Sequence, residues 1–197
     1  MRIVKKEIRI VGFDDGPFIP RTKGKAPVIG VVFRGGDFLD GVFKTEVEID
    51  WMDGTDVIAG VVNKSKHKGQ LRIIMLHGIT LGGFNMVNIS NLYKMTKLPV
   101  IVINRKKPDL KKIKSALLNF KDFKDRWKCV EDAGKIHKVS IEKNKNVYYQ
   151  FKGLKKLDVE EIIRISCTRS LIPEPLRVAH MIASALVKGE SRGRPWM

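Results

Sequence analysis

The chain has 197 residues, of which 43% are hydrophobic and 30% charged, and it carries a formal net charge of +17 at pH 7. This length can bury a substantial core, and we expect a single domain over residues 1–188 and a flexible tail over residues 189–197. The absence of any apolar run of about 18 residues excludes a membrane-spanning helix and argues against a membrane partner. Two cysteines, Cys129 and Cys167, lie far apart without metal-type spacing, which is typical of reduced thiols in a cytoplasmic protein.

The first 50 residues predict three strands joined by turns, which together form an antiparallel meander. We expect these strands at residues 8–13, 28–34 and 41–50. A Gly/Pro-rich loop over residues 14–27 separates the first two strands, and residues 35–37 form a turn. Charged and apolar side chains alternate along the third strand, as they do in a strand with one buried face.

After residue 50 the pattern changes to strands that alternate with helices. We expect strands at residues 71–76 and 99–103, and a late, exposed strand at residues 147–151. We expect helices from Asp53 or Thr55 to Val62, around residues 87–95, from Asp109 to Leu117, around residues 123–130, from Asp158 to Ile165, and at residues 175–187. This order favours an α/β fold with a central mixed sheet (α+β in its strand pairing) and helices on both faces.

An acidic pair, Asp14 and Asp15, follows the first strand. A strand holds a carboxylate rigidly, and the Gly/Pro loop after it opens space in front. Proteins hold a hard cation such as Mg²⁺ for phosphate chemistry in this way. The alternative is a turn-opening aspartate whose side chain caps the backbone amides that follow. If strands 8–13 and 71–76 are parallel neighbours, Asp14 and His77 lie side by side, which is the ribonuclease H-like arrangement.

His180 lies on the last predicted helix, which has Pro175 in its first turn and an apolar face. A histidine on such a helix is either a structural residue with a polar partner or a ligand. Arg177, on the same helix, can pair with Glu174 or with Asp14.

A glycine-rich loop runs from Gly78 to Asn85 between a strand and a helix. Its small residues allow a phosphate to approach closely, but it matches no nucleotide-binding fingerprint. It can equally be a tight connection. Thr80 and Asn85 are candidates to hold a substrate hydroxyl or a bound water.

Positive charge is concentrated in the second half of the chain. Residues 104–156 contain seventeen basic and six acidic side chains, whereas residues 1–54 contain nine of each. Clustered Lys and Arg side chains favour contact with a phosphate backbone, so we expect nucleic acid as a partner. The alternative is a solvated, lysine-rich surface. The candidate nucleic-acid-binding residues are Arg105, Lys106, Lys107, Lys111 and Lys112.

Three blocks of the sequence resemble endonuclease V. Residues 12–14 (GFD) are similar to its first-strand Gly-x-Asp, and residues 73–78 (IIMLHG) to its second catalytic strand, which ends in Asp-Gly. Residues 173–180 (PEPLRVAH) are similar to its C-terminal Pro-x-Pro-x-Arg-x-Ala-His helix start. Other segments, FRGG, GFN and RKKPDL, resemble more closely a mainly archaeal family that is distantly related to endonuclease V. The resemblance implies a ribonuclease H-like fold and a site that includes Asp14, His77 and His180, and Asp15 is an additional carboxylate beside it. We therefore expect a catalytic site formed by Asp14, Asp15, His77 and His180, with Asp14 and His77 as metal ligands.

Two departures from the endonuclease V pattern concern its metal ligands. His77 stands where that family has Asp, and residues 61–70 contain neither its Glu nor its Pro-Tyr-Ile-Pro wedge. An imidazole is a poor substitute for a hard Mg²⁺ ligand, and a site with one carboxylate binds Mg²⁺ weakly. We therefore expect a nucleic-acid-binding protein with an eroded metal-dependent nuclease site and weak or no hydrolysis. The alternatives are an active Mg²⁺-dependent endonuclease acting on DNA or RNA, and a non-catalytic protein-interaction module.

Overall fold

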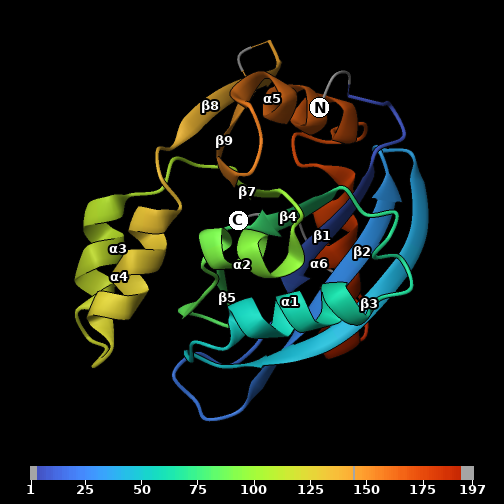
Figure 1. Cartoon of the computed structure of the whole chain (residues 1–197). Helices are drawn as coiled ribbons and strands as arrows, with labels where there is room; N and C mark the ends of the chain where they lie inside the picture. Colours follow the sequence, from blue (N-terminus) through green and yellow to red (C-terminus); the bar gives the residue numbers. More distant parts are fainter. Residues whose placement is uncertain (1–3, 144, 192–197) are drawn as a thin grey trace.

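The computed structural model describes residues 4–143 and 145–191, and it contains a seven-stranded mixed sheet with helices on both faces (Figure 1). The strands lie side by side in the order β3 (Phe38–Glu48), β2 (Lys25–Arg34), β1 (Arg9–Asp15), β4 (Ile73–His77), β7 (Val100–Asn104), β9 (Lys145–Lys152) and β8 (His137–Glu142). The three central strands, β1, β4 and β7, are parallel to one another, and antiparallel pairs flank them on both sides. The expected central mixed sheet is confirmed.

The register of β1 against β4 sets the position of the acidic pair. Ile10 lies opposite Ile73 and Phe13 lies opposite Leu76, so the two parallel strands end together. The residues that follow these pairs, Asp14 and His77, therefore emerge at the same edge of the sheet. The predicted parallel pairing of these two strands is confirmed.

Helices cover the two faces of the sheet with separate cores. One face is covered by α1 (Gly54–Lys64) and α2 (Ile89–Thr96), and the other by α5 (Lys156–Ser166) and α6 (Glu174–Lys188). Side chains of a strand alternate between faces, so Val11 and Phe13 pack toward α1 and α2, whereas Ile10 packs toward α5. A further pair, α3 (Leu110–Leu117) and α4 (Phe123–Asp132), lies beside the sheet, at the left in Figure 1.

Two glycines allow α6 to lie directly on β1. A Cβ atom on Gly12 would be 2.6 Å from the Cβ of Pro175, and one on Gly16 would be 2.7 Å from the carbonyl oxygen of Ala183. Both distances are shorter than any real Cβ contact, so a larger residue at either position would force the helix away. Glycine at these positions thus fixes the height of α6 above the strand.

Several sequence predictions need correction. The edge strand β8 was not predicted, and its hairpin partner β9 is an interior strand with Tyr149 fully buried, not an exposed one. Lys155, and not Asp158, is the N-cap of α5. Asp53 is the N-cap residue of α1 but makes no capping hydrogen bond with its side chain, whereas Asp109 caps α3 as predicted.

The glycine-rich loop contains a short hairpin of β5 (Thr80–Leu81) and β6 (Asn85–Met86). Most of the predicted tail, residues 192–197, lies outside the described residues. In the described part of the chain no helix is both long enough and apolar enough to cross a membrane.

Candidate functional site

The carboxylate of Asp14 lies between two imidazoles at the carboxyl ends of β1 and β4. Its Oδ1 is 3.2 Å from His77 Nδ1, at the end of β4, and its Oδ2 is 2.8 Å from His180 Nδ1, on α6. Asp14 is only 2% exposed, whereas the side chains of His77 and His180 are 29% and 30% exposed. The predicted grouping of these three residues is confirmed, and their catalytic and metal-binding roles stay predictions.

The ionisation of Asp14 determines which ring nitrogen of each histidine carries a proton. Burial alone would raise the pKa of Asp14, but hydrogen bonds from His180 and His77, with their charges, together hold that pKa below its usual range. An ionised carboxylate only accepts hydrogen bonds, so Nδ1 of each imidazole must be the donor. In the neutral form of each ring, Nε2 then carries the lone pair.

Asp15 does not join this cluster. Because successive side chains of a strand point to opposite faces, Asp15 lies on the α1 and α2 side of the sheet. There its Oδ2 accepts a hydrogen bond of 2.9 Å from the Gly82 backbone amide. Burial, with a contribution from the charge of Asp14, raises the pKa of Asp15 to about 6. The catalytic role of Asp15 stays a prediction.

The donor groups around Asp14 do not fit Mg²⁺. Both oxygens of the Asp14 carboxylate are engaged by imidazoles, and Asp15 is bonded to the backbone on the other face. Over residues 4–143 and 145–191, no group of three or more His, Cys, Asp or Glu side chains is arranged to hold a metal ion. Mg²⁺ requires a shell of oxygen ligands, which one carboxylate and two imidazoles do not supply.

Asn85 has a structural function, contrary to the expectation that it could hold a substrate group. It is fully buried, and its amide nitrogen donates to the carbonyl of Glu48 and to the carboxylate of Asp53. Its Oδ1 accepts from the Gly54 amide at 2.9 Å. Asn85 therefore joins the β5–β6 hairpin to the connection between β3 and α1.

Arg177 pairs with Glu174 and not with Asp14. Its guanidinium contacts both oxygens of the Glu174 carboxylate at 2.7–3.0 Å, and Glu174 is only 3% exposed. This ion pair lies in the first turns of α6, the helix that carries His180. It stabilises the start of that helix beside the site.

The predicted nucleic-acid-binding residues lie on the surface next to the end of β7. All five are exposed: Arg105, Lys106 and Lys107 in the loop after β7, and Lys111 and Lys112 in the first turn of α3. The Asp109 carboxylate accepts hydrogen bonds from the backbone amides of Lys111 and Lys112, which fixes the start of α3. Their contact with nucleic acid stays a prediction.

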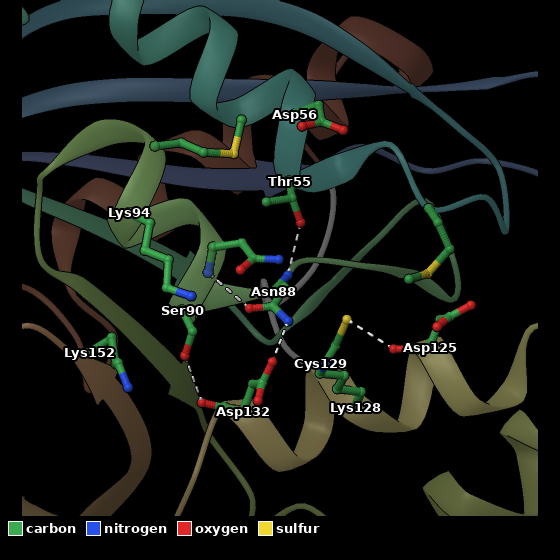
Figure 2. Close-up of a pocket in the computed structure, with 13 residues that line it drawn as sticks. Thr55, Asp56, Asn88, Ser90, Lys94, Asp125, Lys128, Cys129, Asp132 and Lys152 are labelled. Atoms are coloured by element: carbon green, nitrogen blue, oxygen red, sulfur yellow. Dashed lines mark hydrogen bonds between the residues drawn. The ribbon is translucent and has the colours of Figure 1, made fainter.

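A cleft of about 840 Å³ lies away from this site, between α1, α2 and α4 (Figure 2). Some of its polar groups bond to one another: Asn88 Nδ2 donates to Asp132 Oδ2 at 2.7 Å, and Ser90 Oγ donates to the Asp132 carbonyl at 3.2 Å. Burial raises the pKa of the Cys129 thiol there to about 11, which makes it unreactive. These hydrogen bonds join α2 to α4 across the cleft. None of Asp14, His77 and His180 lines it.

A smaller cavity adjoins the site; of its polar residues, Thr80 was a predicted candidate, whereas Asn104 and Gln150 were not predicted. It has a volume of about 160 Å³ and is lined by Gly78, which follows His77, and by Asn104 at the end of β7 and Gln150 on β9. Amide side chains at strand positions give no sequence signal beyond ordinary polarity. Only its position indicates a function for Asn104: it directly follows the last apolar residue of a parallel strand. Ligands of α/β sheets bind at that edge of the sheet.

Comparison with known proteins places the chain in a family. The family model described as endonuclease dU matches residues 6–187. A UPF0215 protein of Methanothermobacter thermautotrophicus is 53% identical over 193 residues, which cover 98% of this chain and 94% of the relative. The crystal structure of a protein of unknown function from Archaeoglobus fulgidus is 40% identical, with a TM-score of 0.83 over 92% of this chain and 99% of that one.

Endonuclease V has the same fold. Endonuclease V of Ciona intestinalis, solved in complex with a 24mer DNA that contains an inosine followed by a ribo-adenosine, gives a TM-score of 0.63 at 13% identity. The match covers 92% of this chain and 86% of that one. At this identity the likeness concerns the fold alone, and with the strand order above it confirms the expected ribonuclease H-like architecture.

Proposed function

The chain belongs to the endonuclease dU family, and we propose that it binds nucleic acid across the carboxyl ends of β1, β4 and β7 and acts on a phosphodiester near a deoxyuridine. One observation supports the position of this site: the buried Asp14 carboxylate holds two half-exposed imidazoles at that edge. The substrate follows from the family's description. The basic loop after β7 supports the choice of a polyanion.

The residues of the site are suited to proton transfer. Asp14 orients both imidazoles through Nδ1, and an imidazole can accept a proton from water when it is neutral or give one to a leaving oxygen when it is protonated. Asp15, on the opposite face of the sheet, has a pKa of about 6 and would act on the imidazoles through its charge alone. Fixed positions on two strands and a helix keep these groups aligned.

We further propose that Mg²⁺ supports weak hydrolysis or none, because the donor set around Asp14 does not fit it. A metal that is commonly bound by imidazole nitrogens, such as Zn²⁺, suits His77 and His180 better. We include a cytoplasmic location in this proposal, since the substrate is found there and Cys129 and Cys167 are both unpaired thiols.

The test uses labelled duplexes that contain one deoxyuridine, one deoxyinosine or neither. Each is incubated with the purified protein in Mg²⁺, Zn²⁺ or EDTA, and products are separated on a gel. We expect selective cleavage near deoxyuridine, slow with Mg²⁺, little or no cleavage of the inosine duplex, and loss of cleavage in Asp14→Asn. Asp37→Asn, which removes the same charge in the exposed β2–β3 turn, is the matched control and keeps the wild-type rate.

Each part of the proposal can fail separately. Robust Mg²⁺-dependent cleavage that Asp14→Asn abolishes would show that the Mg²⁺ site is intact after all, and would support the active endonuclease. Cleavage that survives Asp14→Asn would place the chemistry elsewhere. A protein that binds none of the duplexes would be an interaction module, and the whole proposal would be wrong.

A further inference from the structure

The cavity beside the site has the size of a single aromatic ring. Its volume of about 160 Å³ lies far below the ~300–1,000 Å³ of pockets for drug-sized ligands and close to that of a ~150 Å³ cavity that binds benzene. Its walls are mostly apolar and come from the β5–β6 hairpin, the loop after β7, α3 and α4, with Phe84, Met86 and Ile113 among them. A flat heterocycle fits such a space, whereas a whole nucleotide does not.

The amide of Asn104 is the polar group best placed to recognise a ligand there. Its Oδ1 lies 3.7 Å from the position that a Cβ on Gly78 would occupy, where the neighbouring strands β4 and β7 end. The structure shows no hydrogen bond from this side chain to any other described residue, and its amide atoms are not sealed from solvent. Gln150, by contrast, is 4% exposed and donates to the Gly134 carbonyl at 2.8 Å, so it is already fixed.

We propose that this cavity receives the uracil base of the substrate after the nucleotide has rotated out of the duplex, and that Asn104 recognises the base by its edge. The inference rests on the proposed function. Uracil presents an N3–H donor beside two carbonyl acceptors. An Asn side chain pairs with that edge through Oδ1, which accepts from N3–H, and Nδ2, which donates to a carbonyl. Enzymes that act on a base in a duplex commonly extrude it into such a pocket.

The neighbouring residues support this path for the nucleic acid. Gly78, in the cavity wall, directly follows His77 of the Asp14 cluster, so a base in the cavity would bring its own phosphates toward the imidazoles. Arg105, Lys106 and Lys107 directly follow Asn104 and are exposed. They are therefore positioned to contact the backbone on either side of the extruded nucleotide.

The same geometry predicts the order of preference among bases. Cytosine has an acceptor at N3 in place of the N3–H donor. It therefore offers no hydrogen to Asn104 Oδ1 in the orientation that pairs with uracil. Thymine presents the same edge as uracil but adds a methyl group that a ring-sized cavity must accommodate. A small apolar pocket discriminates against one additional methyl group by about tenfold or more. An abasic site retains the phosphates and lacks the base.

The test measures binding in EDTA, so that it does not depend on cleavage. Fluorescence anisotropy gives the Kd for duplexes with a single uracil, cytosine, thymine or tetrahydrofuran abasic site opposite guanine. We expect the wild type to bind uracil about tenfold or more tighter than the abasic duplex, given the usual discrimination by a bidentate amide contact. Asn104→Ala should abolish this preference and leave the Kd for the abasic duplex unchanged.

Two further variants sharpen the result. Asn104→Asp, which only accepts hydrogen bonds when ionised, should shift the preference from uracil toward cytosine, whose N4 amino group donates. Ile113→Phe should fill the cavity and reduce uracil binding without removing any polar group. Asn91→Ala, an exposed asparagine on α2 that lines the larger cleft, is the matched control and should behave as the wild type.

The outcomes separate this inference from the proposed function. If the wild type binds uracil and abasic duplexes equally, or if Asn104→Ala keeps the preference, the cavity is not the base pocket, even where deoxyuridine cleavage is observed. If the uracil preference depends on Asn104 but no cleavage occurs with any metal, the base pocket stands and the endonuclease assignment fails.

Discussion

Asp14 is the residue on which the candidate site depends, because a single buried carboxylate positions two imidazoles. Each oxygen of Asp14 accepts from a different histidine, and the two histidines come from a strand and from a helix more than 100 residues later in the chain. A carboxylate that orients imidazoles in this way acts through them, as the residues behind metal-bound histidines do in other proteins. A substitution at Asp14 therefore changes the orientation of both rings.

A substitution at His77 tests whether the site can be restored for Mg²⁺. His77→Asp places a second carboxylate beside Asp14 and releases one oxygen of Asp14 from its imidazole. We expect it to tighten Mg²⁺ binding, measured by isothermal titration calorimetry, more than it raises the cleavage rate, because residues 61–70 still supply no Glu. His67→Asp, which adds the same charge beside β3, should leave Mg²⁺ binding unchanged. Equal gains in binding and in rate would contradict this prediction.

The raised pKa of Asp15 predicts that its ionisation weakens the fold. A carboxyl whose pKa rises from 3.8 in the unfolded chain to about 6 in the folded one binds its proton more tightly when folded. Its contribution to stability is therefore greatest below pH 3.8 and falls as pH rises to about 6. The shift of about two pKa units corresponds to about 3 kcal/mol at neutral pH.

Asp15→Asn should remove this penalty, because its amide oxygen can still accept from the Gly82 amide. We expect the variant to have a higher Tm than the wild type at pH 7.5 and a smaller difference at pH 4.5, measured by circular dichroism. Asp37→Asn, at an exposed turn, is the control and should leave Tm nearly unchanged at both values. A variant that is less stable than the wild type at pH 7.5 would show that the Asp15 carboxylate stabilises the fold.

At the scale of elements, Arg126 fastens α4 to the rest of the molecule. It is 2% exposed, and its guanidinium donates to the backbone carbonyls of Asp50, Trp51 and Phe84. It also pairs with the Asp122 carboxylate at 2.7 Å and lies over the Phe120 ring. One buried cation thus joins α4 to the end of β3 and to the β5–β6 hairpin.

Removal of this guanidinium should loosen the α3–α4 pair. Arg126→Met leaves three carbonyls without their donor, and we expect a loss of about 3 kcal/mol or more in the free energy of unfolding, measured in urea. Arg164→Met removes an exposed arginine of α5 that lies 3.4 Å from Glu160, and it should cost under about 1 kcal/mol. Similar losses in the two variants would mean that Arg126 does not hold α4 in place.

The elements differ in how far the sequence could predict them. The central strands carry near-continuous apolar runs, so β1, β4 and β7 were predictable, and the order of strands placed Asp14 next to His77. The strand β8 was missed because its two apolar residues, Val139 and Ile141, stand among charged ones. The function of Arg126 could not be predicted, since its partners are backbone carbonyls that only the folded chain brings together. The placement of Asp14 and Asp15 on opposite faces of the sheet could have been predicted from the alternation of side chains along a strand.

At the scale of the whole molecule, the net charge of +17 is distributed unevenly, and this predicts salt-dependent binding. Lys106, Lys107, Lys111 and Lys112 are all exposed beside the cavity. We expect the affinity for nucleic acid to fall steeply as salt rises, because phosphate contacts release counterions. Reversal of these four charges to Glu should weaken binding and reduce the slope of log K against log salt by about 1 for each of these lysines that binds a phosphate.

The control for this prediction keeps the total charge equal. Reversal of Lys5, Lys6, Lys64 and Lys66, which are exposed and lie outside residues 104–156, changes the net charge by the same amount. Glu residues in the first turn of α3 favour that helix, so the test variant should remain folded. If both sets weaken binding equally, the partner senses only the overall charge, and the surface beside the cavity has no special function.

The position of α6 has a consequence for the synthesis of the protein. A ribosome completes all seven strands of the sheet before it makes the helix that carries His180, and a domain generally folds as a unit. Until α6 has been made, the nascent chain lacks both His180 and the helix that packs against Gly12 and Gly16. The site would thus be complete only after α6 has left the ribosome, so a chain that stops short of α6 could not act on nucleic acid through this site.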